Sequence, residues 1–150
     1  MAALHPAILP FATGLLLFAA LLDAAGTVVR RQSLASASHW NLLGGTVAAI
    51  VAVVTGWIAL GALDPSPGPG PAALLNLHRA LGIIVVLVFA PLAGWRLALK
   101  GARPVRGQTL YLTLLFVGAA ALLGATALGE VAVYQHGVGV SAARAAPQPR

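Results

Sequence analysis

Four long stretches of almost uninterrupted apolar residues constrain this chain more than any other feature. They cover about residues 6–29, 40–63, 77–99 and 109–134. The hydrocarbon layer of a bilayer is about 30 Å thick, and a helix of roughly 20 apolar residues crosses it. The runs do not alternate between polar and apolar residues, as strands of a membrane barrel would. The stretches therefore predict four membrane-spanning helices.

The composition excludes a soluble globular domain. Hydrophobic residues make up 59% of the 150 residues and charged residues only 8%, whereas about a quarter of the residues in a soluble domain are charged. Although the net charge is +6, no run of Lys and Arg is interleaved with aromatic residues, so we expect no nucleic-acid partner. Because the chain has no cysteine, a bound cofactor would be held by His, Met, carboxylate or backbone groups.

The spacing of the four stretches predicts the fold. Spans of this length joined by short connections favour an all-α, integral membrane, antiparallel four-helix bundle with up-down-up-down topology. We predict a single domain over residues 1–140 and a flexible tail over residues 141–150. The Pro- and Gly-rich segment 64–71 is expected to form a connection without helix.

The positions of the basic residues predict the orientation. Short loops rich in Lys and Arg mark the cytoplasmic side of a membrane protein. Most of the basic residues lie in or next to the connections after the first and third spans, namely Arg30, Arg31, Arg96, Lys100, Arg103 and Arg106. We therefore expect both termini to lie outside, with the chain in the cytoplasmic (inner) membrane of a bacterium and the lipid bilayer as its surroundings.

Three of the four histidines fall at the predicted outer side. His5 begins the first span, His78 begins the third and His136 follows the fourth, with Glu130 nearby. Ionisable groups at membrane depth usually face the bundle interior and pair with another group. We predict that these four residues form a cofactor site, whereas His39 lies at the inner side.

Several occupants suit such a site. Haem iron takes axial imidazoles, which favours b-type haem held by His78 and His136, with His5 as a supporting or alternative ligand. Copper or zinc is the competing occupant, because His5, His78 and His136 around a small ion make a familiar ligand set, which Glu130 would complete. The alternative to any cofactor is that the histidines are interfacial hydrogen-bonding residues.

At the inner side, Asp23 is expected to pair with His39 or Arg96, and a role in a proton path is the less favoured interpretation. The small residues Gly118, Ala121, Ala125 and Gly129 recur at helical spacing and favour close helix packing. No arrangement of nucleophile and base indicates an enzyme.

Several motifs together resemble one family. They are His5-Pro6 before an apolar span, Asp23 near its end, the span beginning at Trp40, His78 at a helix start, and LGEVAVYQHGVGV at residues 128–140. In these features the chain resembles the DUF2231 family of predicted bacterial membrane proteins.

The resemblance implies four membrane helices, and the histidine positions of the family match His5, His78 and His136. It also implies a redox setting, because related proteins occur beside or fused to Rieske and cytochrome modules. Our leading hypothesis is therefore an electron-transfer membrane component that binds haem and has a cytochrome or Rieske protein as partner. The alternative is a non-catalytic assembly subunit that packs in a homo- or hetero-oligomer.

Overall fold

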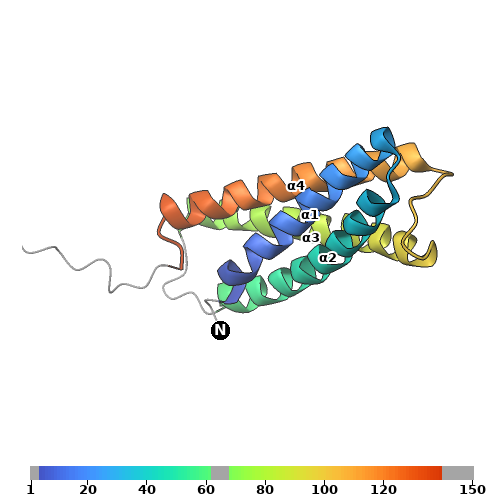
Figure 1. Ribbon diagram of the computed structural model, residues 1–150. Helices are drawn as coiled ribbons and strands as arrows, with labels where there is room; N and C mark the ends of the chain where they lie inside the picture. Colours follow the sequence, from blue (N-terminus) through green and yellow to red (C-terminus); the bar gives the residue numbers. More distant parts are fainter. Residues whose placement is uncertain (1–3, 62–67, 140–150) are drawn as a thin grey trace, which may run out of the picture.

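The computed structural model describes residues 4–61 and 68–139 and is all-helical over these residues (Figure 1). It contains α1 (Leu4–Val29), α2 (Gln32–Gly61), α3 (Pro69–Ala98) and α4 (Gln108–Tyr134). Each of the four is long and apolar enough to cross a membrane. The predicted all-α fold with four spans is confirmed. The predicted tail at 141–150 lies outside the described residues.

The helices form an antiparallel four-helix bundle. Helices α1 and α3 each pack against both α2 and α4. As a result, α1 lies diagonally opposite α3, and α2 lies diagonally opposite α4. Figure 1 shows the α1–α2 and α3–α4 connections together at one end of the bundle.

Helix α3 begins earlier than the apolar stretch predicts. Gly68 is its N-cap, and the first turn contains Pro69, Gly70 and Pro71. The prediction that segment 64–71 is free of helix is therefore wrong for residues 69–71. The physical reason is that the first turn of a helix has no intrahelical partner for its N–H groups, so that proline fits there without losing a hydrogen bond. Asp64 lies outside the described residues.

Small residues allow the helices to approach closely inside the bundle. A Cβ added at Gly45 of α2 would lie 2.8 Å from Cγ of Leu16 on α1. A Cβ added at Gly118 of α4 would lie 2.9 Å from Cε2 of Phe89 on α3. Leu16 and Phe89 are completely buried. The glycines at helical spacing therefore pack within the bundle, as the sequence predicts.

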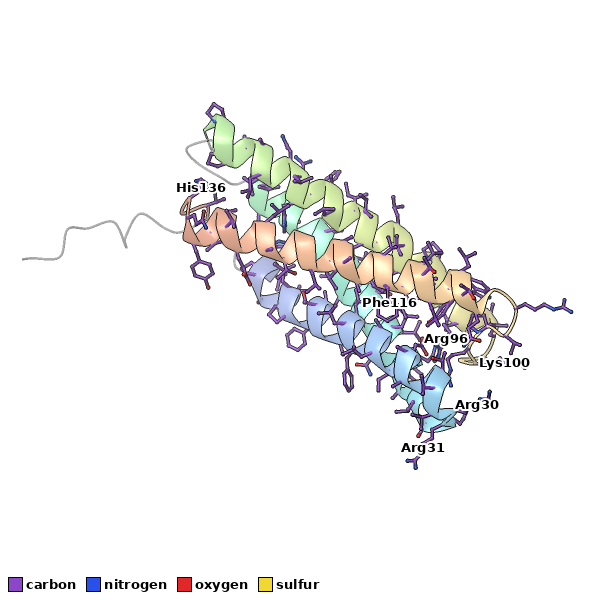
Figure 2. All side chains as sticks on the ribbon, turned by 90° about the horizontal axis from the view of Figure 1, so that it is seen from above. Arg30, Arg31, Arg96, Lys100, Phe116 and His136 are labelled. Carbon is purple, nitrogen blue, oxygen red and sulfur yellow. The ribbon has the colours of Figure 1, made fainter. Side chains whose placement is uncertain are left out.

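Polar groups gather at the two ends of the bundle. We call the end that holds His5 and His78 the histidine end, and the end that holds Arg30, Arg96 and Lys100 the arginine end. Figure 2 shows His136 at the histidine end and Arg30, Arg31 and Lys100 at the other. At about 1.5 Å per residue, His5 and Asp23 lie about 27 Å apart along α1, close to the thickness of a hydrocarbon layer.

Candidate functional site at the histidine end

His5 is held by a backbone carbonyl of the neighbouring helix. It lies in the first turn of α1, where its side chain is half-buried, and its Nδ1 atom is 2.7 Å from the carbonyl oxygen of Ala52 on α2. In an α-helix the carbonyl of residue i points toward residue i+4, which here is Gly56. A Cβ added at Gly56 would lie 2.9 Å from Cε1 of His5. The absence of a side chain at Gly56 thus opens the Ala52 carbonyl to the imidazole.

His78 is held in the same way on the other side of the bundle. Its Nδ1 atom is 2.7 Å from the carbonyl oxygen of Ala125 on α4. Gly129 follows Ala125 by four residues, and a Cβ added there would lie 3.2 Å from Cε1 of His78. Each imidazole therefore sits on an Ala-x-x-x-Gly segment of the helix that packs beside it.

The two imidazoles meet across the centre of the bundle. The ring centroids of His5 and His78 are 6.1 Å apart, and the ring planes are nearly perpendicular at 89°. Their helices, α1 and α3, are diagonal partners, so the two rings reach toward each other between α2 and α4. Two residues 73 positions apart thus share one site.

The hydrogen bonds determine which ring nitrogen carries the proton. A carbonyl oxygen only accepts hydrogen bonds, so Nδ1 of each ring is the donor. In a neutral imidazole, Nε2 then keeps its lone pair. A histidine that binds a metal commonly donates its other ring N–H to a carboxylate or a backbone carbonyl, which fixes the ring orientation and raises the basicity of the ligand. This end of the bundle therefore holds two imidazoles in fixed orientations.

The other two predicted site residues are not joined to this pair. Glu130 and His136 are exposed, and His136 lies beyond the end of α4. The predicted partner of His78 is His136, whereas in the structure the ring of His78 lies next to that of His5, because the diagonal helices α1 and α3 bring these two rings together. Across residues 4–61 and 68–139, no group of three or more His, Cys, Asp or Glu side chains is arranged to hold a metal ion.

A buried ion pair occupies the arginine end. Nη1 of Arg96 donates to both carboxylate oxygens of Asp23, at 2.9 and 2.7 Å, and both side chains are completely buried. The hydroxyl of Tyr111 donates to Oδ2 of Asp23 at 2.6 Å. The predicted partner of Asp23 is thereby settled as Arg96. Tyr111 is not among the predicted site residues, although it lies at the same depth one turn into α4.

Arg96 also ties this cluster to the connections. Its Nη2 atom donates to the carbonyl oxygens of Ala35, at 2.7 Å, and Gly101, at 2.9 Å. His39 packs beside Gly101, where an added Cβ would lie 3.0 Å from Cδ2 of the ring. The cluster includes groups from α1, α2, α3 and α4 and therefore holds the four helices together at this end of the bundle.

The four apolar helices, whose charged and histidine side chains lie near the two ends of the bundle, define a multi-pass helical membrane protein. The chain belongs to the DUF2231 family, described as predicted membrane proteins, whose family model matches residues 1–142. No curated protein and no solved structure matches the chain. The resemblance drawn from the motifs is thus confirmed, and it supports the architecture without naming a cofactor.

Proposed function

We propose that this protein is a membrane component of an electron-transfer assembly and binds b-type haem through His5 and His78. The observation that carries the proposal is the pair of facing imidazoles, each donating Nδ1–H to a backbone carbonyl. Such a donor pair would leave the Nε2 lone pair of each ring available to a metal.

The separation of the rings supports a shared metal. A bond between a metal and an imidazole nitrogen is about 2.0 Å long. The ring centroids of His5 and His78 are 6.1 Å apart, so both imidazoles lie within reach of one metal ion. His5 and His78 would hold the haem iron together, and the haem would supply the electron-transfer chemistry.

The number of ligands favours haem over zinc. A zinc site takes three or four protein ligands, whereas the structure brings together only two imidazoles from the predicted set. A porphyrin supplies four nitrogens itself, so two imidazoles complete the coordination of its iron. Copper is the second candidate, since imidazole also suits copper and the close approach of the rings suits a small ion.

The charge distribution suggests how the site faces the membrane. The basic residues of the arginine end are typical of a cytoplasmic side. In the cytoplasmic membrane of a bacterium, the histidine end would then face outward. A haem at that end would exchange electrons with an external partner such as a cytochrome or a Rieske protein.

Absorption spectroscopy tests the proposal. The full chain is purified in mild detergent from cells supplied with haem, and its visible spectrum and metal content are measured. We expect a Soret band that is lost in His5→Ala and in His78→Ala. The exposed His136 provides a matched control, because His136→Ala should keep the band if only the facing pair binds iron.

Other results would refute the haem proposal. Colourless protein that contains copper would move the assignment to the second candidate. Colourless protein without metal would remove both and leave a packing or assembly subunit. A Soret band that survives in both His5→Ala and His78→Ala would show that haem binds elsewhere. Thermal unfolding of each variant confirms that a lost band reflects lost ligation rather than a lost fold.

A further inference from the structure

The surroundings of the two histidines are repeated along the chain. His5 bonds to Ala52 and His78 bonds to Ala125, and each partner lies 47 residues after its histidine. Each ring also lies against a glycine, four residues beyond the alanine. The histidine, alanine and glycine around His78 each follow their counterparts around His5 by 73 positions. Asp23 and Arg96 are also 73 positions apart.

The same shift aligns the two halves of the sequence. Helices α1 and α2 fall on α3 and α4 with no insertion or deletion. Identical residues occupy equivalent positions, among them the pairs His5/His78, Ala20/Ala93, Leu42/Leu115, Gly45/Gly118, Ala52/Ala125 and Gly56/Gly129.

The buried faces coincide under this shift as well. Five of the six buried residues of α1, namely Ala12, Leu16, Ala19, Ala20 and Asp23, correspond to Val85, Phe89, Leu92, Ala93 and Arg96, which are the buried residues of α3 except for Leu75. Six of the nine buried residues of α2, namely Ser38, Leu42, Gly45, Thr46, Ala49 and Ala52, correspond to Tyr111, Leu115, Gly118, Ala119, Leu122 and Ala125, which are the buried residues of α4 except for Ala132. The two halves therefore share their inward-facing register as well as individual residues.

Packing contacts obey the same relation. Gly45 lies against Leu16, and the equivalent Gly118 lies against Phe89. Helix α1 packs against α4, and its equivalent α3 packs against α2. These contacts thus have counterparts in the other half of the bundle.

We infer that the chain is a tandem repeat of one two-helix unit, with α1–α2 and α3–α4 related by a pseudo-two-fold axis along the bundle. Because α1 and α3 run in the same direction, the repeats are parallel, and the axis lies along the membrane normal. It passes between His5 and His78, so each unit supplies one equivalent imidazole to a single site. The number of cofactors follows from this and rests on the proposed function: one haem per chain, which the equivalent residues His5 and His78 would hold.

The arginine end breaks the equivalence of the units. The equivalent positions there hold Asp23 and Arg96, and two identical units would instead bury two carboxylates or two guanidinium groups together. Like charges without partners are costly in a buried setting. The ion pair therefore favours packing of unit α1–α2 against unit α3–α4 over packing against a second copy of α1–α2.

Charge inversion tests the equivalence at this end. Asp23→Arg and Arg96→Asp, made singly in the full chain, should each lose most of the folded monodisperse protein in detergent, whereas the double variant should recover it. Tyr111 and Ser38 are also equivalent positions. Adding Ser38→Tyr and Tyr111→Ser to the double variant should raise its melting temperature, because the phenol would again reach the relocated carboxylate. A melting temperature that is unchanged or lower would overturn the inference.

A distance measurement tests the axis without altering the core. The chain has no cysteine, so pairs of cysteines at exposed positions carry spin labels without background. The pair Phe11–Leu123 becomes Ile84–Ile50 under the shift, and all four side chains are exposed. The two pairs should give the same distance by pulsed electron spin resonance. As a control, Leu87 in place of Ile84 should give a different distance.

Unequal distances for the two equivalent pairs would refute the pseudo-two-fold axis. Neither experiment needs a cofactor. Equal distances in colourless, metal-free protein would sustain the repeat while removing the haem proposal. A Soret band in protein with unequal distances would do the reverse.

Discussion

Removal of one partner from the buried Asp23–Arg96 pair should destabilise the bundle strongly. In Asp23→Leu the guanidinium of Arg96 stays completely buried and loses both carboxylate oxygens, so that Nη1 keeps only the Tyr111 hydroxyl, at 3.2 Å. Breaking a buried pair in this way costs about 3–5 kcal/mol. Total folding stabilities are commonly about 5–15 kcal/mol, so the loss would be a large part of the whole.

Replacement of both partners should cost much less than either single change. Apolar residues of similar volume in place of a buried ion pair are often neutral or stabilising. We expect Asp23→Leu with Arg96→Met to lie within about 2 kcal/mol of the parent protein, because no unpaired charge is left behind. Tyr111→Phe should lose about 1.5–3 kcal/mol, since it removes one hydrogen bond to a charged group.

Unfolding in mixed micelles provides the assay. Trp95 lies beside Tyr111, with ring centroids 6.0 Å apart, so its fluorescence reports on this end of the bundle. Denaturing detergent is titrated into folded protein, and the free energies of unfolding are compared. Arg106→Ala is the matched control, because Arg106 is exposed at the same end and should change stability by no more than about 0.5 kcal/mol.

Two results would refute this reasoning. A loss below about 1 kcal/mol in Asp23→Leu would mean that the pair behaves like an exposed one. A double variant as unstable as the sum of the singles would mean that the two residues act independently.

Three glycine substitutions test close packing and backbone strain in the same assay. Gly45→Ala should cost about 1–3 kcal/mol because its Cβ would lie 2.8 Å from Leu16. Gly14→Ala should be neutral or stabilising by up to about 1 kcal/mol, because its Cβ would meet no neighbouring group within 4 Å. Equal effects of the two substitutions would contradict the packing argument. Gly101→Ala should cost about 1 kcal/mol or more, because Gly101 has φ +83° and lies against His39, and a neutral result would show that this connection rearranges freely.

The fold follows from the sequence because each helix is determined by a long apolar segment of its own. Apolar length predicts each helix by itself, and short connections leave few arrangements other than an antiparallel bundle. The start of α3 was missed because hydropathy measures the apolar segment, whereas Pro69 and Pro71 meet only the requirements of a first helical turn.

The site follows from the sequence only in part. Depth along the spans places His5, His78 and His136 at one end, yet depth does not state which way a side chain turns around its helix. Packing sets the direction of the side chain: next to Gly56 and Gly129, the rings of His5 and His78 reach backbone carbonyls of the neighbouring helices. The 73-residue shift is a signal in the sequence itself, since it aligns His5 with His78 and Gly56 with Gly129.

The polar groups at the two ends of α1 lie about one hydrocarbon thickness apart, which ties this protein to bilayers of matching depth. In a thinner bilayer, the histidine end would protrude into water or the whole bundle would tilt to bury it. Lipid chain length would thus control the exposure of the imidazole pair to water, with no change in the amino-acid sequence.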